Sequence, residues 1–156
     1  MNAPLPAQRK FQPKDPGFAA RVRASFARQK AMVLIGATLT VVEPGYTEIA
    51  LPYRADLTQQ KAFVHGGILG MIADSACGYA AYSLMPATSS LVTVEYKINI
   101  LAPAKSDLVA RGEVIRPGRT LTIARGDVYA ADGTHVASML QTLMMLADTP
   151  DTPEAT

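Results

Sequence analysis

The stretch from Phe63 to Ala81, FVHGGILGMIADSACGYAA, places one carboxylate inside the most apolar segment of the chain. A buried carboxylate without a partner is costly, or it takes up a proton. Asp74 lies about two turns inside the helix that this run predicts, so it cannot be the N-cap residue of that helix. A structural salt bridge to a lysine or arginine on a strand is one interpretation. The other is that Asp74 faces a cavity and acts as a base or a nucleophile.

The motif His65-Gly66-Gly67 at the start of this run favours the catalytic interpretation. Glycine lets the backbone approach a ligand closely, and the free N–H groups and positive dipole end of the helix lie here. Such a site could polarise a carbonyl and stabilise an oxyanion. Glycines needed only for a tight turn or close packing are the structural alternative. His65 could be a general base, although a histidine at a helix start more often hydrogen-bonds to the loop.

The spacing of these groups sets a condition on the assembly. Gly67 and Asp74 are seven residues apart, which is roughly 10 Å along a helix axis. A carboxylate reaches only a few ångströms from its backbone, so it cannot act on a carbonyl held at the start of its own helix. Two such helices running antiparallel across a twofold axis would bring each Asp74 to Gly67 of the other chain. The sequence therefore predicts a dimer with two shared sites.

The composition is that of a single globular domain. The chain has 156 residues, of which 49% are hydrophobic and 18% charged, and this is long enough to bury a core. The net charge of +2 does not indicate binding to nucleic acid or to a membrane surface. Cys77 is the one cysteine, so an intrachain disulfide or a cysteine-cluster metal site is excluded. Because we find neither a signal peptide nor an apolar run long enough for a membrane span, we expect a cytoplasmic protein.

The remaining elements predict an α+β fold. Residues 1–15 and 148–156 are rich in proline and polar groups and are expected to be flexible, around one domain of residues 16–147. Apolar side chains four positions apart predict an amphipathic N-terminal helix within residues 17–32. Alternation and turn signals predict strands within residues 37–53 (two around Pro44-Gly45), 93–100, 107–116, 119–130 and 134–146. The economical packing is a curved antiparallel sheet wrapped around one long central helix.

Two of these strands carry finer predictions. In residues 93–100, Val94, Tyr96, Ile98 and Ile100 alternate with polar residues, which predicts a half-buried strand with Thr93 on its polar side. The strand over residues 134–146 is almost continuously apolar, as expected for a strand that is covered on both faces.

The segment HGGILGMIADSACGYA resembles the signature of the hotdog-fold acyl-CoA thioesterases, in particular their PaaI-type (phenylacetate-pathway-like) group. In that group a His-Gly-Gly precedes a helical aspartate by the spacing found here. TVEYKINILAPAK resembles the strand after the helix, RPGRTL resembles the next turn between strands, and the similarity runs from about Ala31 to Leu146. The resemblance implies a hotdog fold, here with an extra N-terminal helix, and hydrolysis of an acyl-CoA thioester to a free acid and coenzyme A.

The resemblance also implies roles for individual residues. The Gly67 N–H would polarise the thioester carbonyl, Gly66 would let the substrate approach, and Asp74 of the partner chain would activate water or attack directly. Thr93 matches a hydroxyl position near the thioester. Two positions depart from the family pattern. Gln59 stands where members often have an asparagine that helps to place the water or the carbonyl, and it is a candidate catalytic residue because it keeps an amide. Gln141 stands where some members have histidine. The residues that match the coenzyme A region are Lys105, Arg116, Gly118 and Arg119.

The expected partners are an acyl-CoA substrate and further copies of the chain, in a homodimer or a homotetramer. Coenzyme A would enter as part of the substrate, and no separate cofactor and no metal is expected. The candidate wall residues of the acyl slot are Met71, Ile72, Tyr79 and Tyr82. Two alternatives remain open: a hotdog hydratase or dehydratase that depends on His65, and a non-catalytic acyl-CoA-binding protein.

Overall fold

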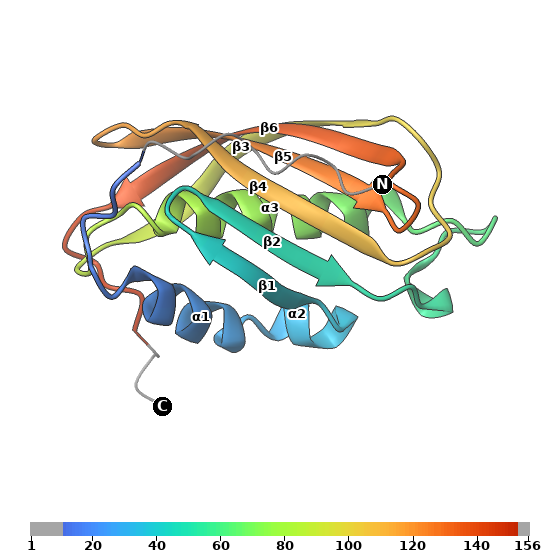
Figure 1. Cartoon of the computed structure of the whole chain (residues 1–156), viewed down its shortest axis with the longest axis horizontal. Helices are drawn as coiled ribbons and strands as arrows, with labels where there is room; N and C mark the ends of the chain where they lie inside the picture. Colours follow the sequence, from blue (N-terminus) through green and yellow to red (C-terminus); the bar gives the residue numbers. More distant parts are fainter. Residues whose placement is uncertain (1–10, 153–156) are drawn as a thin grey trace.

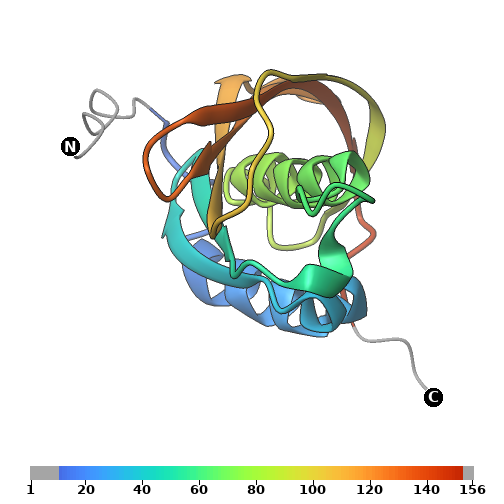
Figure 2. The same cartoon turned by 90° about the vertical axis from the view of Figure 1, so that its right-hand side faces the viewer.

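A single apolar helix, α3 (Gly66–Tyr82), lies at the centre of the computed structural model, which describes residues 11–152 (Figures 1 and 2). Eleven of its 17 residues are buried, on nearly all sides of the helix. This confirms the prediction from the apolar character of its whole circumference.

Six antiparallel strands form one sheet that curves over α3 (Figure 2). Their order in space is β1-β2-β4-β5-β6-β3, so the strand that follows α3 in sequence forms one edge of the sheet. This arrangement confirms the predicted α+β hotdog architecture. The strands are β1 (Thr38–Glu43), β2 (Tyr46–Leu51), β3 (Ser90–Ile100), β4 (Leu108–Arg116), β5 (Leu121–Ala130) and β6 (His135–Leu146).

Two glycines allow the sheet to lie very close to α3. Gly112 on β4 and Gly126 on β5 are paired across the strands. A Cβ atom on Gly112 would lie 2.2 Å from the carbonyl oxygen of Ala76, and one on Gly126 would lie 2.9 Å from Sγ of Cys77. Any larger residue would push the sheet away from the helix, so these glycines set the spacing between the two layers. We call this contact the glycine seam.

The N-terminal segment forms two helices, where the sequence predicted one. They are α1 (Phe18–Arg28) and α2 (Lys30–Ile35), and between them Gln29 leaves the helical conformation with a ψ of 93°. The 3₁₀ turn η1 (Ala55–Leu57) comes after β2. Arg21 on α1 donates hydrogen bonds to the carbonyl oxygens of Tyr82 and Met85 at the C-terminal end of α3. A cation there also complements the negative end of the α3 dipole, so α1 is tied to the central helix.

Strand β3 departs from regular alternation. A bulge between Thr93 and Glu95 shifts its register against β6 and turns Thr93 toward α3. The prediction that Thr93 lies on the polar side of the strand is therefore wrong. Because β3 is an edge strand, its predicted half-burial is incomplete as well: Val94 is 52% exposed and Tyr96 is 45% exposed.

Strand β6 is covered on one face only within the described chain. Gln141 and Leu143 face α3 and are fully buried, whereas Leu140 on the outer face is 54% exposed. The prediction that this strand is covered on both faces is thus wrong for the single chain.

Most of the two segments predicted to be flexible, 1–15 and 148–156, falls outside the described residues or at their margins. Within the described part, Asp15 accepts hydrogen bonds from the Gly17 N–H and from Arg21, and Asp151 contacts α1. No helix within residues 11–152 combines the length and the apolar character that crossing a bilayer requires.

Candidate active site

Asp74 is held on α3 by two side chains from the sheet. The Thr93 hydroxyl on β3 donates to Oδ1 of Asp74 across 2.8 Å. Gln141 on β6 donates from Nε2 to the same oxygen, and also to the Thr93 hydroxyl oxygen across 2.9 Å. The three side chains form a closed triangle of hydrogen bonds, which restricts the carboxylate to one orientation.

The second oxygen of Asp74, Oδ2, accepts no hydrogen bond from the described residues. Within residues 11–152 no lysine, arginine or histidine forms an ion pair with Asp74 either, so the structural salt bridge considered as an alternative is not found there. One oxygen is therefore fixed, and the other is available to water or a substrate.

A cavity of about 310 Å³ opens beside Asp74, between α3, α1 and the first half of β3. The α3 residues that line this cavity are one, four, five and eight positions after Asp74, a spacing that places them all on one side of the helix. Of the candidate wall residues, Tyr79 and Tyr82 line this cavity and Met71 and Ile72 do not. Burial raises the pKa of the Tyr79 hydroxyl, which therefore stays protonated. We call this the Asp74 cavity; its lining residues on α3 are Asp74, Ser75, Gly78, Tyr79 and Tyr82.

At the start of α3, His65 is the N-cap residue, and its Nδ1 accepts a hydrogen bond of 2.9 Å from the Gly67 N–H. The Gly67 N–H, for which the family resemblance implied the contact with the thioester carbonyl, thus already has an acceptor. The Gly66 N–H, one residue earlier, has none among residues 11–152. The free donor at the positive end of the helix is therefore that of Gly66.

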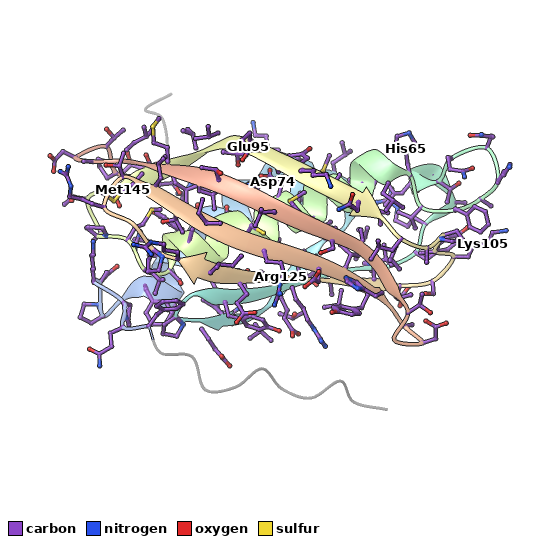
Figure 3. The ribbon with its side chains drawn as sticks, turned by 90° about the horizontal axis from the view of Figure 1, so that it is seen from above. His65, Asp74, Glu95, Lys105, Arg125 and Met145 are labelled. Atoms are coloured by element: carbon purple, nitrogen blue, oxygen red, sulfur yellow. The ribbon has the colours of Figure 1, made fainter. Side chains whose placement is uncertain are left out.

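A second cavity of about 300 Å³ lies at this helix start and is lined by Gly66, Gln59 and Ile100 among others. No residue lines both cavities. Gly66 and Asp74 are eight residues apart, which is roughly 12 Å along the helix axis. In Figure 3, His65 and Lys105 lie toward one end of the molecule, Met145 lies at the other end, and Asp74 lies between them.

The residues expected to bind coenzyme A do not meet in one chain. The Lys105 ammonium lies 4.6 Å from the ring centroid of Phe63, which lines the second cavity. Arg116 ends β4, and Gly118 and Arg119 follow it in an exposed turn. Since Lys105 precedes the start of β4, that strand separates the two groups by roughly 25 Å.

Other reactive side chains are placed away from this chemistry. Burial, reinforced by the charges of Asp74 and Asp127, raises the pKa of the Cys77 thiol far above its usual value, so it is not a nucleophile. His135 on β6 forms a hydrogen bond of 3.0 Å between its Nε2 and Oδ1 of Asp127 on β5, and its ring stacks on that of Tyr129, also on β5. Among the described residues, no group of three or more histidine, cysteine, aspartate or glutamate side chains is arranged to hold a metal ion.

Sequence reasoning missed part of the lining of the Asp74 cavity. Ser25, Arg28 and Gln29 from the N-terminal helices and Asp151 from the C-terminal segment line it. Residues at both ends of the chain meet there, and no motif in either segment indicates the contact. Gln141 was noticed only as a departure from a family pattern, and its contact with Asp74 depends on strand pairing.

Comparisons with known proteins agree on one family. The model of the Thioesterase superfamily matches residues 62–137, which include His65, Asp74 and Thr93. A thioesterase family protein of known structure from Silicibacter pomeroyi is 47% identical, with a TM-score of 0.81 and coverage of 84% of this chain and 99% of that chain.

Two further solved structures are similar at lower identity. The PaaI protein from the phenylacetic acid degradation operon of E. coli is 18% identical, with a TM-score of 0.79 and coverage of 85% of this chain and 96% of its own. A thioesterase from Haemophilus influenzae is 19% identical, with a TM-score of 0.74 and coverage of 78% and 86%. At these identities the similarity is one of fold.

Proposed function

Since the chain belongs to the thioesterase superfamily and is a thioester hydrolase, we propose that it cleaves acyl-CoA thioesters at a site shared by two copies of itself. The observation that carries this proposal is the state of Asp74. Its Oδ1 is held by Thr93 and Gln141, its Oδ2 has no donor among the described residues, and the residue itself borders a cavity.

The free Oδ2 has two possible roles in the hydrolysis. As a base, it takes a proton from water while the water oxygen attacks the carbonyl carbon, and the C–S bond then breaks to release the coenzyme A thiolate. As a nucleophile, Oδ2 attacks the carbonyl carbon itself, and the C–S bond breaks to release the coenzyme A thiolate and leave an acyl-Asp74 anhydride. Water then cleaves this anhydride, which gives the free acid and restores the Asp74 carboxylate. Both courses give the free acid and coenzyme A and use the same oriented carboxylate.

The charge that develops on the carbonyl oxygen needs a donor, and the Gly66 N–H is the one we assign to it. It lies at the positive end of the α3 dipole and has no acceptor among residues 11–152. His65 then serves as a cap: by accepting from the Gly67 N–H, it holds the first turn in place. That contact gives no support to the alternative in which His65 is the base of a hydratase or dehydratase.

A dimer would join the two halves of the site, and the free edge of β3 suggests how. Thr93 touches Asp74, and Ile100 lies against Gly66, since a Cβ atom on Gly66 would be 2.7 Å from Ile100 Cδ1. If β3 paired antiparallel with its copy about an axis near Tyr96, Thr93 of one chain would face Ile100 of the other. Each Asp74 would then lie beside the partner's Gly66.

The position of Gly70 on α3 is consistent with a twofold axis near Tyr96. Gly70 is midway between Gly66 and Asp74 along α3, and the Tyr96 hydroxyl lies 3.5 Å from where its Cβ would be. In such a dimer the twofold axis would make the β4 strands of the two chains run in opposite directions. The turn at residues 116–119 of one chain would then lie at the same end of the dimer as Lys105 of the other chain. We assign the phosphates of coenzyme A to this combined basic region.

The test follows thiol release from a panel of acyl-CoA thioesters by the wild type and by Asp74→Asn. We expect turnover of at least one thioester by the wild type and a loss of roughly 100-fold or more in the variant. Asp56→Asn is the matched control, because Asp56 pairs with Arg54 on the surface. Tight binding of acyl-CoA without thiol release would instead identify a non-catalytic binding protein, and an unimpaired Asp74→Asn would exclude the mechanism.

A further inference from the structure

The C-terminal segment of the chain closes part of the Asp74 cavity. After β6 ends at Leu146, residues 147–152 leave the sheet and run to α1 (Figure 1). There Asp151 contacts Arg28, whose Nη2 lies 3.0 Å from Oδ2 and donates across 2.9 Å to the Asp151 carbonyl oxygen. The Ser25 hydroxyl also donates to Oδ2 of Asp151. We call these three residues, Ser25, Arg28 and Asp151, the tail latch.

The tail latch lies away from the catalytic carboxylate along the cavity. Helix α1 runs antiparallel to α3: the Ser75 hydroxyl donates to Oε1 of Gln29 across 3.3 Å, and the hydroxyls of Ser25 and Tyr79 are 3.2 Å apart. Gln29 is thus level with the Asp74 end of the cavity, and Ser25 is more than one helical turn further on. Gly78 and Tyr79 of α3 line the cavity between these two levels, so an acyl group that extends along the cavity from Asp74 would point toward the latch.

We propose that the tail latch limits the length of the acyl group, so that the preferred substrates are short or compact acyl thioesters. This inference rests on the proposed function and concerns the same site. A long aliphatic chain would have to pass the Arg28–Asp151 pair, and it would then either strip water from these charges or push the C-terminal segment aside. A short acyl group ends before it reaches them.

The latch can be opened without unfolding the protein. The side chains of Arg28 and Asp151 are 37% and 34% exposed, and ion pairs of this kind contribute little to stability. Neither residue belongs to the α3–sheet core. A substitution at Asp151 should therefore release the segment while leaving Asp74, Thr93 and Gln141 in place.

The experiment measures kcat/KM for straight-chain acyl-CoA thioesters of increasing length, with the wild type, Asp151→Ala and Arg28→Gln. We expect the wild type to favour the short end of the series. Both variants should raise the ratio of long-chain to short-chain kcat/KM by roughly 10-fold or more, mainly through a lower KM for the long chains. Asp148→Asn is the matched control, because it removes a carboxylate from the same segment outside the cavity.

The outcomes separate the two proposals. If the wild type favours the long thioesters, or if neither variant changes the ratio although Asp74→Asn abolishes turnover, the tail latch does not limit the acyl group and the proposed function stands. If the wild type releases thiol from no thioester, the proposed function fails and the inference fails with it. The melting temperatures of all variants are measured alongside and identify any variant that does not fold. If one latch variant does not fold, the ratio measured with the other latch variant tests the inference.

Discussion

Gln141 donates a hydrogen bond to Oδ1 of Asp74 from a position with no exposed surface. The same amide is incompletely satisfied, because its Oε1 is buried and has no partner among residues 11–152. A buried acceptor without a donor costs about 1–3 kcal/mol of stability. Gln141 therefore serves to orient Asp74 rather than to stabilise the fold.

Replacing Gln141 by leucine should lower kcat by roughly 10-fold or more with little change in KM, because the carboxylate loses a donor that orients it. The melting temperature should not fall, because the unpartnered acceptor is removed as well. Gln141→Glu places a second carboxylate beside Asp74 and disfavours ionisation of the pair, so the acid limb of the pH profile should move to higher pH. A rise in KM alone in both variants would contradict this role.

The capping role of His65 can be separated from catalysis. Asparagine is also a good N-cap residue, since its side-chain oxygen accepts from the first turn. We expect His65→Asn to keep thiol release within a few-fold of the wild type, whereas His65→Ala should lose about 1 kcal/mol of unfolding free energy. If His65→Asn were as inactive as Asp74→Asn, the imidazole would be part of the chemistry.

The assignment of the carbonyl donor to Gly66 predicts the effect of proline there. Proline fits the first position of a helix and removes the N–H, and His65 before it already has the extended conformation that proline favours (φ −63°, ψ 138°). The Cβ that proline adds is also present in alanine. Gly66→Pro should lower kcat by about 100-fold. Gly66→Ala is the control, since it adds a Cβ against Ile100 but keeps the N–H.

The shared site predicts complementation between two inactive variants. Co-expressed Asp74→Asn and Gly66→Pro chains should regain about a quarter of the wild-type activity, because half of randomly paired dimers are mixed and each of these has one complete site. Sedimentation would establish that dimers form. No recovery in mixed dimers would mean that both groups act within one chain.

The buried thiol predicts how stability depends on pH. The ordinary thiol pKa is 9.0 and folding raises the pKa of Cys77, so above about pH 9 the unfolded chain binds fewer protons than the folded one. The unfolding free energy should therefore fall as pH rises through this range, by up to ~1.4 kcal/mol per pH unit. Denaturant titrations of the wild type and Cys77→Ala should differ in this slope, and equal slopes would contradict it.

The sequence predicted the elements that depend on local pattern. Apolar character around a whole circumference predicted α3, and alternation with turn residues predicted six strands around it. It did not predict the bulge between Thr93 and Glu95. A bulge inserts one extra residue, so the side chains before it point to the opposite face of the sheet from the one that regular alternation predicts. Nor did it predict the break at Gln29, where neither proline nor glycine marks the end of a helix.

The site, like the fold, was predictable from the sequence only where it depends on local residue patterns. The types and spacing of Asp74 and the glycines at the helix start indicated their chemistry and the need for a second chain. Which N–H is free depends on where the His65 ring turns, and the tail latch joins Arg28 to a residue 123 positions away. Both are tertiary contacts that no local pattern encodes.

The glycine seam has a consequence for how such an enzyme can diversify. Gly112 and Gly126 hold α3 in one axial setting against β4 and β5, so the carboxylate keeps its alignment with the sheet whatever happens at the two chain ends. Part of the cavity wall opposite that helix comes from α1 and the C-terminal segment, and the rest comes from β3. Exchanging the terminal segments between homologues could thus change the acyl preference while the position of Asp74 relative to the sheet stays the same.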